Sequence, residues 1–235
     1  MSFSIGKDIP CVIFAMEYTL APRCKIEDIV KECNTAYELL IKNLESLFKF
    51  KARKVILSGD SAGGFLSLNL TNYIIKNNMR RPDGLVLIYP CTRLFFREMS
   101  PSSLLALTDS MIDSPFLSQL LDLTMNVDTF YKREVTLDSR HDFFLTEESV
   151  VKQFPKCFIV AGSIDPIRDE CYRFLDFMSK HGVEVEMKEY LYFPHGFMNI
   201  TSLIDPFYYP GLQQVKDYIK LIFNNEESLK IGKIE

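Results

Sequence analysis

Apolar segments of strand length alternate with helical segments along this chain. Short apolar runs typical of buried strands occur at residues 9–16 (IPCVIFAM), 54–58 (KVILS), 85–89 (LVLIY) and 156–161 (KCFIVA). Residues 25–48 place apolar side chains three or four positions apart, which is the period of a helix with one buried face. A second helical stretch follows residue 61 and runs to about residue 76. This alternation predicts an α/β protein with a mostly parallel sheet and flanking helices.

The stretch after residue 90 breaks this alternation. It contains no clear strand and is rich in serine, phenylalanine and short helical patterns, so we expect an irregular, cap-like insertion at about residues 91–150. A final helix is predicted at about residues 212–223, and the charged tail at about 225–235 is expected to be mobile. Without internal repeats or a low-complexity linker, residues 1–235 are interpreted as a single domain.

A helix and an edge strand are predicted between these regions. The apolar face of the helix consists of Cys171, Phe174, Leu175 and Met178, and Gly182 is its expected stop. The residues at 183, 185 and 187 are apolar and alternate with charged neighbours, so this strand has one solvent-facing side and should lie near a sheet edge.

Composition and charge exclude several classes of protein. The chain is 47% hydrophobic and 25% charged, as expected for a globular protein with a buried core. Its net charge of −4 gives no electrostatic reason to expect nucleic acid or an anionic membrane as a partner. No apolar run is long enough for a membrane span, and residues 1–16 lack the pattern of a signal peptide. Six scattered cysteines favour reduced thiols in a cytosolic protein, and three distant histidines give no reason to expect a metal site.

One short motif carries candidate chemistry. GDSAG at residues 59–63 fits G-x-S-x-G, a weak signal alone, but a predicted strand ends just before it and a predicted helix begins just after Ser61. That setting is typical of a nucleophile elbow, in which the serine occupies a strained turn and its neighbours two positions away must be small. Gly59 and Gly63 meet this requirement. The N-terminus of the following helix would direct free N–H groups toward the reacting atoms.

Asp165 and His195 are candidates for the groups that activate Ser61. A serine hydroxyl needs a base, and that base needs an orienting group, before it can attack at neutral pH. Asp165 and His195 each follow a predicted strand, so both should lie at the same rim of the sheet as Ser61, where open α/β sheets bind ligands. Each also has an ordinary interpretation, since His195 lies in a Pro-Gly turn and Asp165 could initiate an Asp-Pro turn. The joint placement of all three favours a catalytic triad.

Four sequence blocks resemble the hormone-sensitive-lipase branch of the α/β-hydrolases. They are EYTLAP at residues 17–22, GDSAGG at 59–64, DPIRDE at 165–170 and PHGF at 194–197. The stretch SPSSLLALTD at residues 100–109 resembles the animal hormone-sensitive lipases themselves. The likeness extends from about residue 9 to about residue 225 and implies an α/β-hydrolase fold.

The resemblance implies a serine carboxylic ester hydrolase, a lipase or esterase that cleaves acylglycerols, steryl esters or smaller esters through an acyl-enzyme. It implies Ser61 as the nucleophile, His195 as the base and Asp165 as the residue that orients His195. The backbone N–H of Ala62 would be an oxyanion-hole donor. The implied partner is a small-molecule or lipid ester, with no metal or cofactor. The expected location is the cytoplasm, with the surface of lipid droplets as the alternative.

The family's His-Gly-Gly-Gly loop, which supplies further oxyanion donors, does not occur in these 235 residues. In the family that loop lies upstream of the Y-x-L-A-P block, together with three strands, one of which lies between the strands predicted here at 9–16 and 54–58. We therefore expect an N-terminally truncated fold in which these two strands carry unpaired backbone or pair directly. Poor solubility or weak activity, relieved by an upstream segment with the loop, is the expected consequence.

Other functions stay open at this point. A non-catalytic ligand-binding protein could use the same scaffold, as the plant gibberellin receptors do, although those lack the catalytic histidine and His195 is present here. A folded but inactive remnant is the second alternative, and the missing glycine loop is its main support.

The roles of several other polar and aromatic residues are also open. His141 is expected to be an exposed polar residue. Asp169 and Glu170 are interpreted as acidic residues in the first turn of a helix. Alternatively, one of them could hold Arg168 or the loop that carries His195 in place. A set of aromatic residues either lines an acyl pocket or forms ordinary core: Phe95, Phe96, Phe130, Tyr131, Phe143 and Phe144.

Overall fold

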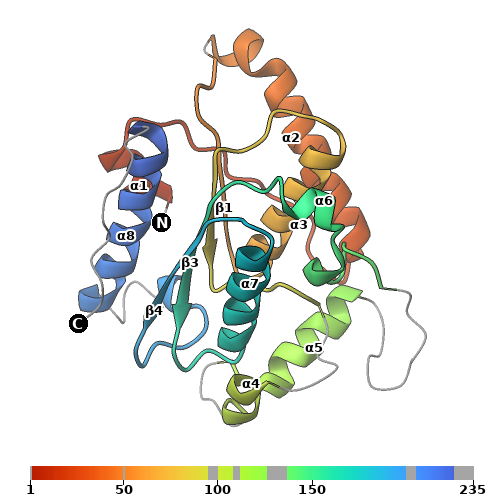
Figure 1. Ribbon diagram of the computed structural model, residues 1–235, viewed down its shortest axis with the longest axis vertical. Helices are drawn as coiled ribbons and strands as arrows, with labels where there is room; N and C mark the ends of the chain where they lie inside the picture. Colours follow the sequence, from red (N-terminus) through yellow and green to blue (C-terminus); the bar gives the residue numbers. More distant parts are fainter. Residues whose placement is uncertain are drawn as a thin grey trace.

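In the part of the chain that the structure describes, four strands form a central parallel sheet in the order β1-β2-β3-β4. The computed structural model describes residues 2–49, 51–94, 100–107, 112–125, 137–199 and 205–224. The strands are β1 (Ile56–Asp60), β2 (Gly84–Ile88), β3 (Cys157–Gly162) and β4 (Val185–Tyr190). Helices pack on both faces of this sheet, so the predicted α/β class is confirmed (Figure 1).

The helices form two layers. α1 and α8 lie on one side of the sheet, and α3 and α7 lie on the other, with α2 packed against α3 (Figure 1). Their bounds are α1 Ser2–Asp8, α2 Ile26–Phe48, α3 Ala62–Lys76, α4 Pro101–Leu105, α5 Ser114–Met125, α6 Glu148–Val151, α7 Arg168–Lys180 and α8 Asp205–Asn224. Short 3-10 turns occupy Phe143–Leu145 and Phe197–Asn199.

Strands β2 and β3 are buried on both faces. Val86 and Phe158 pack in the core beneath α8, whereas Leu87 and Ile159 pack in the core beneath α3 and α7. All of these side chains are fully buried. A strand covered by helices on both faces has no solvent-facing side, which explains why β2 and β3 occur in the sequence as continuous apolar runs.

The predicted strand lies at the sheet edge, with a shift along the chain, but the predicted alternation of a buried and a solvent-facing side is not seen. Among the described residues β4 ends the sheet and pairs with β3 alone, and its side chains are all half-buried. It begins at Val185 rather than at Val183, and Gly182 takes a φ of 78° just after α7, as expected of a helix stop.

The strand predicted at residues 9–16 is wrong. In the structure this segment belongs to no strand, and Val12, Ile13, Phe14 and Met16 are exposed. Apolar side chains favour a strand only where a neighbouring strand accepts their backbone hydrogen bonds. Among the described residues β1 pairs with β2 alone, so the alternative in which residues 9–16 pair directly with β1 is wrong as well.

The insertion contains short helices, as its short helical patterns indicate. Its described parts contain α4, α5, a 3-10 turn and α6. The tail at 225–235 lies outside the described residues, and the single-domain interpretation stays a prediction. In the part of the chain that the structure describes, no helix is both long and apolar enough to cross a membrane.

The aromatic stack between β3 and α8 should contribute strongly to stability. The Phe158 ring lies parallel to the Tyr218 ring with centroids 5.1 Å apart and is fully buried. Phe158→Ala should lower the free energy of unfolding by about 3–5 kcal/mol, because it leaves a cavity in a close-packed core. Phe116→Ala, at a half-exposed ring on α5, is the matched control and should cost less than about 1 kcal/mol. Equal shifts in the urea unfolding midpoints of the two variants would contradict this account.

Candidate active site

Ser61 sits at the junction between β1 and α3 in an unusual backbone conformation. Its φ is 52° and its ψ is −117°, a region that residues with a side chain rarely occupy. The turn is tied to the end of β2, because the Ser61 N–H donates to the Ile88 carbonyl at 2.9 Å and the Ser61 carbonyl accepts from the Cys91 N–H at 3.2 Å. The surrounding chain therefore holds the strained residue in place, as expected of a nucleophile elbow.

Close backbone packing makes two glycines necessary at this turn. A Cβ on Gly59 would lie 2.1 Å from the Gly63 carbonyl oxygen, and one on Gly64 would lie 2.7 Å from Pro90 Cβ. A Cβ on Gly63 would meet nothing closer than an Asp60 carboxylate oxygen at 4.0 Å. The requirement for a small residue is therefore met by Gly59 and Gly64, and the expectation for Gly63 is wrong because its Cα faces open space.

The structure brings Ser61, His195 and Asp165 together. His195 Nε2 lies 2.8 Å from Ser61 Oγ, and His195 Nδ1 lies 2.8 Å from Asp165 Oδ2. Asp165 and His195 are only 1% and 3% exposed, so the hydrogen bond between them is shielded from water. Asp165 comes from the loop after β3 and His195 from the loop after β4, and both loops emerge at the carboxyl end of the parallel sheet.

Hydrogen bonds tie the two loops to each other and to the elbow. The Ser163 hydroxyl accepts from the Tyr192 N–H at 2.8 Å, and the Ile164 N–H donates to the Phe193 carbonyl at 3.2 Å. The Asn199 amide donates to the Asp60 carboxylate at 2.8 Å. The three loops that carry the candidate residues thus form one connected framework.

Two residues at the site have no signal in the sequence. The fully buried Tyr89 packs its ring against the His195 ring, with centroids 4.9 Å apart. Cys91 lies next to Ser61, and burial raises the pKa of its thiol to about 12, so this group stays neutral. Neither residue belongs to a recognisable motif. The path of the chain after β2 brings each of them to the site, and a local sequence pattern does not reveal that path.

Ala62 is the first residue of α3, directly after Ser61. The first N–H groups of a helix have no acceptor within that helix, and the positive end of the helix dipole lies there. Ala62 is exposed at this end of the helix.

Asp169 and Glu170, the last two residues of the DPIRDE block, lie in the first turn of α7, as predicted. Asp169 pairs with Arg168 at 2.8 Å. Glu170 binds Arg93 at 2.6 Å rather than a residue of the histidine loop, and it also accepts from the Thr92 hydroxyl at 3.3 Å. Both members of the Arg93–Glu170 pair are buried, so α7 is fixed to the segment that follows β2.

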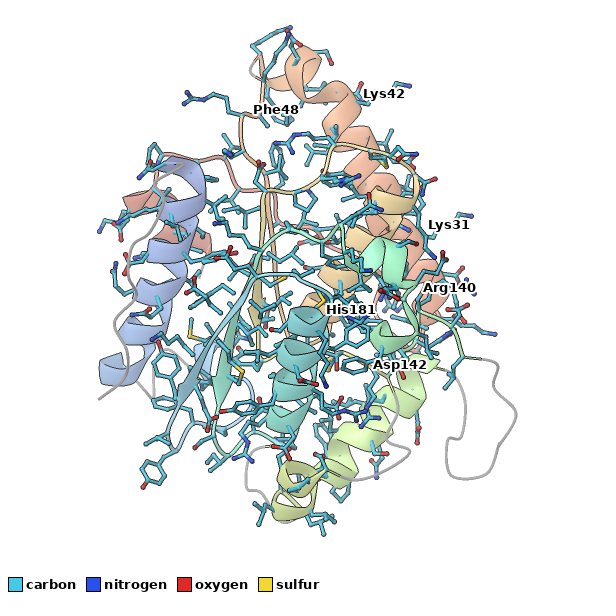
Figure 2. The ribbon with its side chains drawn as sticks, viewed as in Figure 1. Lys31, Lys42, Phe48, Arg140, Asp142 and His181 are labelled. Carbon is cyan, nitrogen blue, oxygen red and sulfur yellow. The ribbon has the colours of Figure 1, made fainter. Side chains whose placement is uncertain are left out.

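The expectation that His141 is exposed is wrong. The residue is buried, with Nε2 3.1 Å from Glu27 and Nδ1 3.2 Å from Asp138. Figure 2 labels its neighbours Arg140 and Asp142, on the segment that lies near α2. A carboxylate on each ring nitrogen compensates for the loss of water, which allows the imidazole to be buried.

Most of the candidate pocket aromatics lie outside the described residues: Phe95, Phe96, Phe130 and Tyr131. Phe143 is buried in the core between α3, α7 and the sheet, in contact with Phe154 and Phe174. It is therefore a core residue rather than part of a pocket wall. Phe144 packs on Phe177 at the border of the same core.

No group of metal-ligating side chains converges within the described ranges. All six cysteines are free thiols. The groups that the structure places together at this site are a serine hydroxyl, an imidazole and a carboxylate, with a helix N-terminus beside them.

Comparison with known proteins assigns the chain to a family. A family model described as alpha/beta hydrolase fold matches residues 4–199. Hormone-sensitive lipase of Mus musculus is 35% identical over 114 residues, which cover 48% of this chain and 15% of that protein. Lipase 2 of Moraxella sp. (strain TA144) is 25% identical over 209 residues, 81% of this chain and 48% of that protein. The chain thus spans about half the length, or less, of these curated relatives.

A solved structure supports the same fold. Carboxyl esterase 2 from the mycorrhizal fungus Tuber melanosporum superimposes with a TM-score of 0.80 at 24% identity, over 95% of this chain and 70% of that one. At an identity this low the superposition compares the folds alone. The shared fold agrees with the parallel sheet and flanking helices described above.

The two glycines of the motif should respond differently to the same substitution. Gly59→Ala should lower the free energy of unfolding by about 2 kcal/mol or more, because the added Cβ meets backbone atoms that cannot move aside. Gly63→Ala should be neutral or stabilise by up to about 1 kcal/mol, because alanine is the better helix former and has room. Thermal unfolding of the two variants measures the difference, and a Gly63→Ala variant as unstable as Gly59→Ala would refute the packing argument.

Proposed function

The chain belongs to the α/β-hydrolase fold family, and from that premise we propose that it is a serine carboxylic ester hydrolase, a lipase or esterase. The observation that carries the proposal is the continuous hydrogen-bonded series from Ser61 Oγ through His195 to Asp165, with both links at 2.8 Å. The names of its lipase and esterase relatives support the same class of reaction.

In the proposed mechanism Ser61 attacks the carbonyl carbon of an ester. His195 Nε2 accepts the serine proton as the new C–O bond forms, and the Asp165 carboxylate orients the ring and stabilises the imidazolium. The tetrahedral intermediate collapses, the alcohol leaves with the proton from His195, and an acyl group remains on Ser61. A water molecule then gives up a proton to His195 and attacks this acyl-enzyme, which releases the carboxylic acid and restores the serine hydroxyl.

The Ala62 N–H is the proposed oxyanion-hole donor. The ester oxygen becomes negatively charged in the transition state, and a helix N-terminus beside Ser61 stabilises that charge more than it stabilises the neutral ester. One donor of this kind is typically worth about 10²–10³ in rate.

The proposed substrates are carboxylic esters, either acylglycerols and other lipid esters or smaller acyl esters. The lipase and esterase names of the relatives support this range of substrates. The aromatic residues suggested for an acyl pocket do not restrict it to one class of ester. The proposed place of action is the cytoplasm, because a chain with six free thiols suits a reducing compartment.

A non-catalytic binding protein on this scaffold is the competing function, and the site argues against it. Such a protein has no need of a base, yet His195 is buried in hydrogen-bonding contact with both Ser61 and Asp165. An imidazole buried between a hydroxyl and a carboxylate is better explained by proton transfer than by packing.

Single and double substitutions of Ser61 and His195 test the mechanism, because the losses in kcat should not multiply when both residues are replaced. Ser61→Ala and His195→Ala should each lower kcat for a short-chain p-nitrophenyl ester by about 10³-fold or more. The kcat of the double variant should be no lower than that of the less active single variant, because the two residues act as one unit. Losses that multiply in the double variant would show that the residues do not act together.

Covalent labelling tests the nucleophile without a choice of ester. A fluorophosphonate probe should label Ser61 in the wild-type chain, and peptide mass analysis should locate the adduct. Asp165→Asn should slow this labelling strongly, because it leaves the imidazole in the wrong tautomer. A wild-type chain that folds but stays unlabelled would favour the non-catalytic alternative.

A further inference from the structure

Helix α4, in the insertion between β2 and β3, rests on the loop that carries Asp165. The Ser102 and Ser103 hydroxyls both donate to the Pro166 carbonyl oxygen, at 3.0 and 2.8 Å. These serines are only 4% and 1% exposed. Two buried hydroxyls from one helix therefore converge on a single carbonyl next to Asp165.

That carbonyl belongs to the peptide group that holds the Asp165 carboxylate. The N–H of the same peptide, from Ile167, donates to Asp165 Oδ1 at 2.8 Å. A peptide group is planar and rigid, so fixing its oxygen also fixes the direction of its N–H. Two donors on the oxygen also polarise the group and make its N–H a stronger donor. The serines thus act on Asp165 through one peptide unit.

Asp169 closes this arrangement from the other side. Its Oδ2 accepts from the Ser102 N–H at 2.9 Å, and its Oδ1 accepts from the Arg168 guanidinium at 2.8 Å. Arg168 in turn donates to the Ser163 carbonyl at 3.1 Å. The backbone carbonyls on both sides of Asp165 are therefore held by the same set of side chains.

The residues that α4 buries indicate why it docks here. A surface helix ordinarily buries its leucines and exposes its serines. In α4 the pattern is reversed, since Ser102 and Ser103 are buried while Leu104 and Leu105 are 52% and 82% exposed. A helix of five residues is also too short to be stable by itself. Polar bonds to the Asp165 loop, rather than apolar burial, therefore account for its position.

We propose that Ser102, Ser103 and Asp169 form a positioning clasp that holds the Asp165 carboxylate against His195. These residues touch no reacting atom and act through the peptide between Pro166 and Ile167. The insertion thereby becomes part of the triad's support. This inference rests on the proposed ester hydrolase function, and it adds a role for residues that the triad itself does not include.

Enzyme kinetics give the first test. Ser103→Ala should lower kcat by about three- to tenfold, and the Ser102→Ala, Ser103→Ala double variant by about 10- to 100-fold, with KM changed less than about twofold. The pH midpoint of kcat/KM should fall by about half a pH unit, because a loosened carboxylate stabilises the imidazolium less well.

Thr71→Val is the matched control. The Thr71 hydroxyl is fully buried and donates to the Ser67 carbonyl at 2.8 Å within α3, away from Asp165. Its removal should cost stability much as Ser103→Ala does, while kcat and the pH midpoint stay at their wild-type values. A Ser103→Ala variant that behaves like Thr71→Val would overturn the clasp.

Proton NMR of the histidine rings separates the clasp from the proposed function. The chain has three histidines, so the His195 signal can be assigned by substitution, and its pH titration needs no turnover of ester. A lower titration midpoint in Ser103→Ala supports the clasp even if the wild-type chain hydrolyses no ester, and an unchanged midpoint overturns it. If the double variant does not fold, Ser102→Ala, which leaves the Ser103 hydroxyl in place, decides the question by the same titration.

Discussion

The turn at Ser61 requires the backbone of β1 to pass within contact distance of the backbone of α3. The clash that a Cβ on Gly59 would make with the Gly63 carbonyl shows how close this approach is. A residue with a φ of 52° is stable only where its surroundings leave no alternative. Here the end of β2 and the segment just after it provide that restraint, through bonds from Ile88 to the N–H and from Cys91 to the carbonyl of Ser61. The position of the hydroxyl thus depends on the pairing of β1 with β2.

The parallel register extends this dependence to the other two residues. Because β1, β2, β3 and β4 run in one direction, every loop that leaves a carboxyl end reaches the same rim. Residues separated by 134 positions, Ser61 and His195, come within 2.8 Å for this reason. Gly162, at the end of β3, allows the two later loops to touch, since a Cβ there would lie 2.2 Å from the Phe193 carbonyl oxygen.

The sequence predicted most of this framework because strong local signals coincide with it. The buried strands β2 and β3, the long α2 and the three residues Ser61, Asp165 and His195 all carry such signals. Residues 9–16 gave the same apolar signal as the buried strands, but whether a strand forms depends on a partner that local pattern does not reveal. The prediction that His141 is exposed was wrong for a related reason, because its burial depends on Glu27, which lies 114 residues away. The buried face of α4 could not be predicted, because its buried side chains are hydroxyls, which hydropathy counts as solvent-facing.

Buried polar contacts behind the triad are better explained by geometry than by stability. A buried pair such as Arg93–Glu170 loses much of its attraction to the cost of removing both charges from water, so apolar residues of the same size would hold the fold as well. Apolar contacts have no fixed direction, however, and permit loops to slide by fractions of an ångström. Hydrogen bonds fix both distance and angle. The proton transfer proposed from Ser61 to His195 would require that control, and the polar groups lie where it would be needed, between the loop of Asp165 and the segments that follow β2.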